Sequence, residues 1–201
     1  MSDCVFLLRH GDTEWTEHEL HTGLRDVPLS DAGRDQAREA GRLLAGRHFD
    51  RVLVSPQSRA RETAELAGIA EPDEVDHDLV EWDYGEYEGQ TDAQVRRVDP
   101  DWNLFRDGAP GGESPEHVRA RADRVLAHVG QLEGVVLLVG HGKMLRALAA
   151  RWLGYDVSLG SGLAMDPAAI CVLEREQTAG PLLRLWNYTS TVLGERGALS
   201  H

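Results

Sequence analysis

Lysine, cysteine and long apolar runs are scarce in this sequence. Lys143 is the single lysine among 21 basic residues, a bias to which we attach no function. Cys4 and Cys171 lie far apart, each within an apolar run, which predicts buried reduced thiols rather than a disulfide or a metal pair. No run approaches the ~20 apolar residues of a membrane span, and the first residues lack the basic segment of a secretory signal. We therefore expect a cytoplasmic protein with no membrane partner.

The charge balance is strongly acidic, with a formal net charge of −13 and an isoelectric point near 5.1. Nucleic-acid binding rests on a basic face that neutralises phosphates, so the sequence argues against a nucleic-acid partner. An acidic surface also repels anionic small molecules, and a site for one must be a local focus of positive charge. With 201 residues, 41% of them hydrophobic, and no repeat or linker, residues 1–201 are predicted to form a single domain.

Apolar segments alternate with helical patterns along the chain. Ser30, Thr91 and Ser114 are predicted to cap helices, and Gly68 to follow the end of one. We expect helices over about 31–47, 58–67, 92–99, 115–131 and 143–153, and strands over 5–8, 51–54, 135–139, 169–174 and 182–188. The last two segments, with a turn at Gly180 and Pro181, indicate a hairpin. The predicted fold is a three-layer α/β sandwich, with a mostly parallel central sheet, one antiparallel edge strand and helices on both faces. The tail from Gly194 is expected to be mobile.

Three of the predicted strands end in side chains suited to binding phosphate. Open α/β sheets place ligands beyond the carboxyl ends of their strands, where these side chains would meet. A histidine beside an arginine can bind an anion or act as a nucleophile, although each motif alone is also typical of an ordinary turn or of a solvated helix. The three strand ends are Arg9-His10-Gly11, Ser55 to Arg59, and Gly140-His141-Gly142.

The ordered set of motifs resembles the histidine phosphatase superfamily, also called phosphoglycerate-mutase-like. The set comprises RHG at 9–11, HTGLRDVPLSDAGRDQA at 21–37, S-x-x-x-RA-x-x-TA at 55–64, EWDYGEYEG at 81–89 and GHG at 140–142. The resemblance covers nearly the whole chain and implies phosphoryl transfer through a phosphohistidine, with no cofactor and no metal. No cluster of metal-ligand residue types stands out in the sequence.

The resemblance also implies roles for five residues. His10 would be the nucleophile, and Arg9, Arg59 and His141 would hold the transferred phosphoryl group. A carboxyl must protonate the leaving alkoxide and later activate water, and Glu81 matches the family's acid. Asp83, Glu86 and Glu88 are rivals, but Glu81 follows the apolar pair Leu79 and Val80, which would anchor it beside the sheet. Because this carboxyl group must be protonated to donate, we expect an activity optimum on the acidic side of neutrality.

Other positions match residues that contact substrate in relatives, namely Thr16, Thr22, Gly23, Tyr84 and Gly142. Thr16 departs from the asparagine common in the mutases, which puts its role in doubt. Arg106, Glu113 and Ser114 are candidates for a substrate-facing loop, although loop structure alone could explain that segment. The remaining histidines are interpreted as surface or structural residues, namely His18, His21, His48, His77, His117, His128 and His201.

Three classes of function make different demands on this sequence. Mutase relatives carry a longer insertion with a basic pair between acid and second histidine, whereas 60 positions separate Glu81 from His141 here. Arg96 and Arg97 come too soon after Glu81 to match the basic pair of the mutases. They are interpreted as part of a solvated helix face. An inactive binding module would be expected to lack a core residue, and all five are present.

Residues 81–89 and 102–114 look most like an acid phosphatase branch of the family and like its sedoheptulose 1,7-bisphosphatases. We therefore predict a metal-independent phosphatase of small phosphomonoesters, such as sugar phosphates and phosphoglycerate-like metabolites. Phosphoglycerate mutase or a specialised sugar bisphosphatase are the alternatives. The sequence leaves open the physiological substrate, residual mutase activity and whether the chain forms a homodimer.

Overall fold

Six strands form one sheet in the computed structural model, which describes residues 4–69 and 71–190. The strand order across the sheet is β3-β2-β4-β1-β5-β6. The strands are β1 (Cys4–Arg9), β2 (Arg51–Val54), β3 (Glu74–Val75), β4 (Val135–Gly140), β5 (Ile170–Glu176) and β6 (Gly180–Tyr188). Strands β1, β2, β3 and β4 pair in parallel, whereas β5 runs antiparallel to both β1 and β6. The mostly parallel sheet is confirmed, and its antiparallel part is a hairpin in which β5 lies one strand in from the edge.

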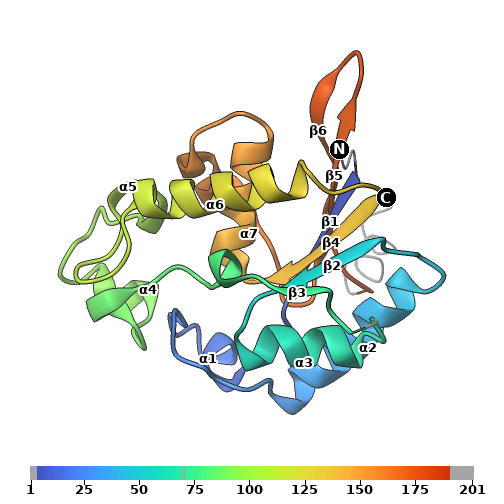
Figure 1. Ribbon diagram of the computed structural model, residues 1–201. Coiled ribbons are helices and arrows are strands. Elements are labelled where there is room, and N and C mark those ends of the chain that lie inside the picture. Colours follow the sequence, from blue (N-terminus) through green and yellow to red (C-terminus); the bar gives the residue numbers. More distant parts are fainter. Residues whose placement is uncertain (1–3, 70, 191–201) are drawn as a thin grey trace, which may run out of the picture.

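Helices cover both faces of this sheet, as the prediction requires (Figure 1). One layer contains α2 (Asp31–Leu44) and α3 (Ser58–Leu66), and the other contains α6 (Pro115–Val129) and α7 (Gly142–Trp152). The connecting segments add the short helices α1 (Glu14–Glu17), α4 (Asp92–Val95) and α5 (Leu104–Asp107), and the 3-10 turns η1 (His77–Leu79), η2 (Gly85–Tyr87) and η3 (Val157–Gly162). The predicted three-layer α/β architecture is therefore confirmed.

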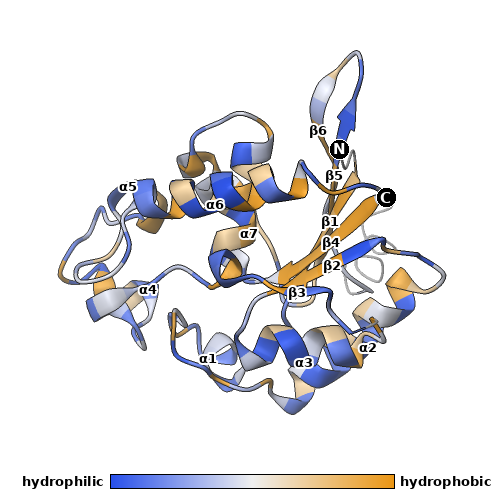
Figure 2. Ribbon diagram, in the orientation of Figure 1, coloured by the Kyte–Doolittle hydropathy of each residue, from blue (hydrophilic) through white to orange (hydrophobic). Residues whose placement is uncertain are grey.

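The central strands are apolar apart from Arg9 at the end of β1, as expected for strands with both faces buried (Figure 2). Alternate side chains enter two different cores. Val5 and Leu7 belong to the core under α6 and α7, whereas Phe6 and Leu8 belong to the core under α2 and α3. Two buried layers hold the central strands from both sides, and this fixes where their carboxyl ends lie.

The predicted caps are present, and helix ends differ from expectation by a few residues. The side chains of Ser30, Thr91 and Ser114 accept hydrogen bonds from backbone amides in the first turns of α2, α4 and α6. Helix α2 ends at Leu44 instead of near residue 47, because Ala45 is already extended. Residues 180 and 181, expected to form the hairpin turn, pair with residues 176 and 175 instead, so the turn lies just before them.

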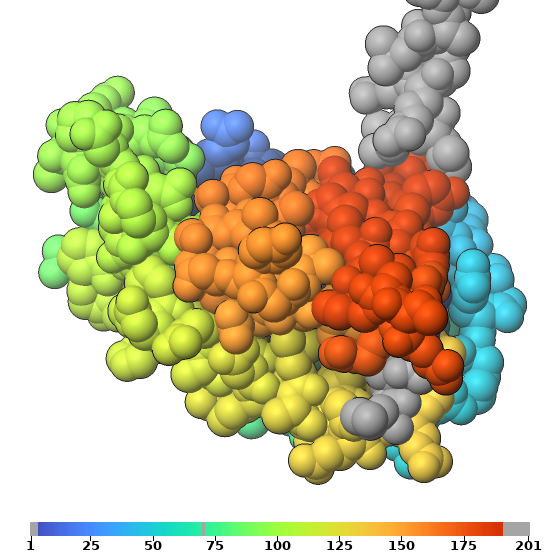
Figure 3. All heavy atoms as spheres, turned by 90° about the horizontal axis from the view of Figure 1, so that it is seen from above, coloured from blue at the N-terminus to red at the C-terminus, as the bar shows by residue number. Residues whose placement is uncertain are grey.

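Seen from above, η3 lies between the α5–α6 segment and the β5–β6 hairpin on one face of the molecule (Figure 3). Within the described ranges, no helix combines the length and the apolar character needed to cross a membrane. The tail expected to be mobile, from Gly194 to His201, lies outside the described residues.

Candidate active site

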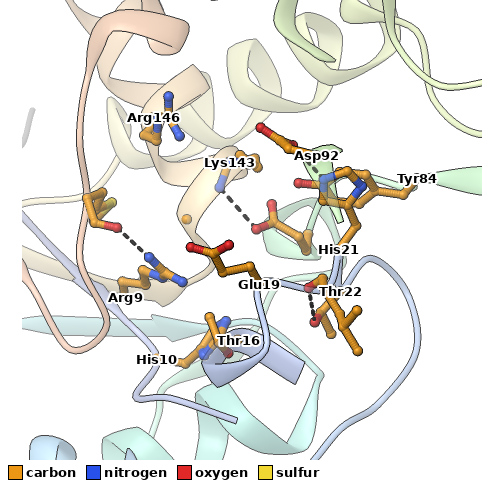
Figure 4. Close-up of a pocket in the computed structure, with 14 residues that line it drawn as sticks. Arg9, His10, Thr16, Glu19, His21, Thr22, Tyr84, Asp92, Lys143 and Arg146 are labelled. Carbon is orange, nitrogen blue, oxygen red and sulfur yellow. Dashed lines mark hydrogen bonds and ion pairs between the residues drawn. The ribbon is translucent and has the colours of Figure 1, made fainter. Parts of the chain in front are cut away.

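The carboxyl ends of β1, β2 and β4 meet at one edge of the sheet and open into a pocket. Arg9 lies level with Gly140, and Val54 with Val139, so the three motifs that follow these strands come together. The pocket has a volume of about 310 Å³ (Figure 4). It is lined by Arg9, His10, Thr16, Glu19, Leu20, His21, Thr22, Glu81, Tyr84, Asp92, Gly142, Lys143, Arg146 and Met165.

His10 is buried at the inner end of this pocket, with 4% of its surface exposed. Its Nδ1 lies 2.7 Å from the carbonyl oxygen of Gly11. A carbonyl can only accept, so Nδ1 carries the proton and Nε2 keeps a free lone pair. Burial, assisted by the charges of Arg59 and Arg9, holds the pKa of His10 well below its usual value of 6.5. His10 is therefore a neutral imidazole with one nitrogen available for attack.

His141 packs edge-on against His10, with 5.0 Å between the ring centroids. It is fully buried, and its Nε2 lies 2.7 Å from the hydroxyl oxygen of Ser55. Its Nδ1 is buried and has no hydrogen-bond partner among the described residues. Burial is the main reason that the pKa of His141 also lies well below 6.5, with the charge of Arg59 as the next cause. Ser55 thus orients the ring and leaves Nδ1 to a ligand.

The buried Arg59 and the partly buried Arg9 carry further N–H groups without a partner among the described residues. Arg59 is fully buried, and its Nη atoms donate to the carbonyl oxygens of Arg25 and Gly23 at 2.9 and 3.0 Å. Arg9 donates through Nη1 to the carbonyl oxygen of Met165. The Nε atoms of both arginines are buried without a partner in the described part of the chain. The alternative of Arg59 as a solvated helix residue is therefore wrong. Buried N–H groups without a protein partner are chemically suited to donate to an anion.

Glu81 is buried, and backbone amides hold its carboxyl group. Oε1 accepts from the amides of Trp82 and Met144, each at 2.9 Å, and Oε2 accepts from the amide of Lys143 at 3.0 Å. The amino end of a helix favours an anion, and α7 begins directly after His141. Two of its amides hold Glu81. The rival acids Asp83, Glu86 and Glu88 are not among the residues that line the pocket.

Glu113 and Arg121 form a clamp behind Glu81. The Arg121 guanidinium donates to the Glu113 carboxylate at 2.6 and 2.8 Å and to the carbonyl oxygens of Asp78 and Val80. Glu113 also accepts from the amide of Asp83 at 3.1 Å. The clamp therefore fastens both ends of the segment that carries Glu81.

None of the three candidates for a substrate-facing loop lines the pocket. Glu113 belongs to the clamp, Ser114 caps α6, and Arg106 is exposed and paired with Asp107. Glycines and a proline shape this loop around Glu81 and its neighbours, and charge alone could not distinguish a supporting residue from a substrate ligand.

Four of the five expected substrate residues line the pocket, and Gly23 does not. The Gly23 carbonyl instead accepts from Gln57 and Arg59 behind the wall. The hydroxyl of Thr16 lies 2.7 Å from that of Thr13 in the capping box of α1. A Cβ at Gly142 would lie 3.2 Å from the Nε of Arg9, so glycine leaves room for that arginine.

Tyr84 and His21 form an aromatic wall of the pocket. Their rings stack with 4.5 Å between centroids, and burial raises the pKa of Tyr84 well above 10. His21 is buried and its Nε2 lies 2.7 Å from the Asp92 carboxylate. From the sequence, His21 was interpreted as a surface or structural histidine, so its place in the pocket wall was not predicted. Its position directly before Thr22 and Gly23, two expected substrate residues, could have indicated this place.

Lys143, Arg146, Glu19, Asp92, Leu20 and Met165 also line the pocket and were not predicted. Lys143 directly follows the GHG motif at 140–142, and this position could have indicated that it lines the pocket. Burial lowers the pKa of Lys143 to about 8. Within residues 4–69 and 71–190, no group of three or more His, Cys, Asp or Glu side chains could hold a metal ion.

Comparisons with known proteins find relatives that are named as phosphatases and as phosphoglycerate mutases. An acid phosphatase from Mycobacterium tuberculosis is 43% identical over 172 residues, which cover 83% of each chain. A sedoheptulose 1,7-bisphosphatase from Saccharomyces cerevisiae is 33% identical over 77% of this chain and 68% of its own. A 2,3-bisphosphoglycerate-dependent phosphoglycerate mutase from Bartonella bacilliformis is 31% identical over 98% of both chains.

The solved structure of the product of an M. tuberculosis open reading frame superposes with a TM-score of 0.88 at 40% identity, covering 92% of this chain and 97% of that chain. The model of the histidine phosphatase superfamily, branch 1, matches residues 5–189. This match spans every pocket residue and, apart from Cys4, all described strands, and the chain belongs to the histidine phosphatase superfamily.

Proposed function

We propose that this protein hydrolyses small phosphomonoesters through a phosphohistidine formed on His10. The observation that carries the proposal is the arrangement around that ring. Its Nδ1 is held by the Gly11 carbonyl at 2.7 Å, which leaves the lone pair on Nε2. The Nε atoms of Arg9 and Arg59 and the Nδ1 of His141 are buried with no hydrogen-bond partner among the described residues. This combination supplies a nucleophile together with donors for the phosphoryl oxygens.

In the first step, the Nε2 lone pair of His10 attacks phosphorus. The N–P bond forms as the bond from phosphorus to the ester oxygen breaks. Arg9, Arg59 and the Nδ1–H of His141 donate to the phosphoryl oxygens, whose charge they stabilise during transfer. The neutral state of His10 matters here because a protonated imidazole has no lone pair to offer.

Glu81 exchanges a proton in both steps. Its Oε2 accepts only one backbone amide, from Lys143, and so has room for a proton. That proton passes to the leaving oxygen and releases the alcohol. In the second step the Glu81 carboxylate takes a proton from water as the water oxygen attacks phosphorus. The N–P bond then breaks, inorganic phosphate leaves, and His10 is again neutral.

No step of this route calls on a metal ion or an organic cofactor. Arginine and histidine N–H groups take the place that a divalent cation occupies in other phosphoryl-transfer sites. The substrates would be sugar phosphates and phosphoglycerate-like metabolites, and a sedoheptulose 1,7-bisphosphatase-like specificity is the narrower version. We further propose that residues 1–201 act as one cytoplasmic domain with a small phosphorylated metabolite as partner, as a monomer or a homodimer.

The experiment is an assay of purified protein on p-nitrophenyl phosphate, glycerol 3-phosphate and 3-phosphoglycerate, with and without a chelator. We expect phosphate release from all three that the chelator leaves unchanged, and little conversion of 3- to 2-phosphoglycerate. Robust isomerisation with little phosphate release would favour the mutase alternative. Loss of activity with the chelator would contradict the metal-free route.

A further inference from the structure

Two cations on the far side of the pocket have no role in the proposed chemistry. Lys143 and Arg146 are one helical turn apart on α7, and both line the pocket. In Figure 4 they lie across the pocket from His10 and Thr16. Over the described residues, neither side chain forms an ion pair with a carboxylate within 4.0 Å. Such cations are usually paired when they are drawn away from solvent.

Arg146 is fixed in its orientation. Its Nε donates to the carbonyl oxygen of Gly160 at 2.7 Å, its Nη2 donates to that of Ser161 at 3.1 Å, and its guanidinium lies over the Phe105 ring at 4.8 Å. These contacts leave Nη1 without a hydrogen bond in the part of the chain that the structure describes. The charge is held in place without being neutralised, as in a site prepared for a ligand.

The carboxylates nearby are engaged elsewhere. Glu81 accepts three backbone amides, and Asp92 contacts the Nε2 of His21 at 2.7 Å and Arg96 at 3.7 Å. Glu19 is exposed at the pocket mouth, where water screens its charge. The two cations therefore keep their attraction for an incoming anion.

There is also space for such a group. A second cavity of about 140 Å³ adjoins the pocket and shares five wall residues with it. The shared residues are His21, Tyr84, Asp92, Lys143 and Arg146. Its other lining residues include Trp102, Asn103 and Phe105.

We propose that Lys143 and Arg146 form a subsite for a second anionic group of the substrate, a carboxylate or a second phosphate. The preferred substrates are then phosphomonoesters with two acidic groups, and their monoanionic or neutral-tailed analogues are hydrolysed less efficiently. The inference rests on the proposed phosphatase function and names its substrate class.

Matched substrates test the subsite. The value of kcat/KM for 3-phosphoglycerate is expected to exceed that for glycerol 3-phosphate by about tenfold or more, since a contact with a charged group is lost in the analogue. Fructose 1,6-bisphosphate against fructose 6-phosphate tests a second phosphate in the same way. In Lys143→Met, the kcat/KM ratio of each diacid to its analogue falls towards one. A general loss of activity lowers both members of a pair equally and leaves the ratio unchanged. Arg97→Met, an exposed neighbour outside both cavities, leaves the ratios unchanged.

The pH profile is a second readout. Because the pKa of Lys143 is about 8, kcat/KM for the diacid falls above pH 8, where the ammonium loses its proton. The other charged or titratable groups that line the two cavities with it are Arg9, His10, Glu19, His21, Glu81, Tyr84, Asp92, Arg96 and Arg146. The pKa of Tyr84 lies well above 10 and that of His21 below 6.5, so neither residue accounts for a fall in kcat/KM near pH 8. Lys143→Arg, which stays charged, removes this fall and retains the preference.

A binding measurement tests the subsite separately from the proposed phosphatase function. Calorimetry with 3-phosphonopropionate, propane-1,3-bisphosphonate and propylphosphonate needs no turnover. Tighter binding of either diacid than of propylphosphonate, lost in Lys143→Met, supports the subsite and shows which second group it prefers. Equal binding of all three, or equal ratios in the wild type and Lys143→Met, overturns it. Absence of hydrolysis with the binding preference intact would contradict only the proposed function.

Discussion

Buried neutral histidines make the stability of this protein depend on pH in a defined direction. The pKa of His10 in the folded protein lies well below 6.5, whereas in the unfolded chain it has its ordinary value near 6.5. As pH falls through 6.5, the unfolded state takes up a proton that the folded state does not. The native state is therefore destabilised on the acid side, and a variant without this imidazole is spared that loss.

The size of the effect follows from proton linkage at this one group. The unfolded chain gains about 0.06 kcal/mol from protonating His10 at pH 7.5 and about 1.4 kcal/mol at pH 5.5. The stability of the wild type relative to His10→Asn should therefore fall by about 1.4 kcal/mol across this range. Asparagine keeps an N–H that can donate to the Gly11 carbonyl, and titrating groups that do not interact with His10 cancel in the difference.

Urea unfolding of both proteins at several pH values between 7.5 and 5.5 measures this difference. Phosphate buffers must be avoided because an anion bound to the native site would stabilise it. A difference in unfolding free energy that stays constant with pH would refute the reasoning, since His10 would then take up its proton equally in both states. His10 would in that case not be a buried neutral nucleophile.

Three further changes have defined outcomes. Glu81→Gln is expected to slow hydrolysis of alkyl phosphates by about 10²-fold or more and of p-nitrophenyl phosphate much less, because the aryl oxygen needs no proton donor; equal losses across pH 5–8 would point to another acid. Glu113→Gln should lower the unfolding free energy by about 2–3 kcal/mol, because the buried Arg121 loses its compensating negative charge and one of two acceptors, as urea titration would show. Gly33→Ala should destabilise by about 2 kcal/mol or more, because its Cβ would meet a backbone oxygen in the loop after β1 at 2.0 Å, whereas Gly162→Ala meets no atom and should be neutral.

Much of the fold was predictable because its signals are local. The apolar run of β1 can only be a buried strand, and Ser114 followed by Pro115 begins a helix by its own chemistry. Helix ends were less accurate because the turn that ends α2 depends on the backbone of Ala45, which has no distinctive side chain.

Pocket residues were predictable from the sequence where they directly follow a strand, and were missed more often where they lie on loops or within helices. Arg9, His10 and His141 sit directly at strand ends, whereas His21 and Arg146 reach the pocket from a loop and from the second turn of a helix. The clamp of Glu113 and Arg121 depends on the path of the loop before α6. Its tertiary contacts to residues 78–83 leave no mark in local sequence patterns.

The central claim is that His10 carries the phosphoryl group during turnover. Rapid quenching in alkali with a ³²P-labelled substrate, followed by peptide mapping at alkaline pH, measures this directly. We expect an acid-labile, alkali-stable phosphoramidate on the peptide that contains His10, absent in His10→Ala, with residual labelling permitted in His141→Ala. Label on the peptide around His141, or an acid-stable label on Ser55, would contradict the account.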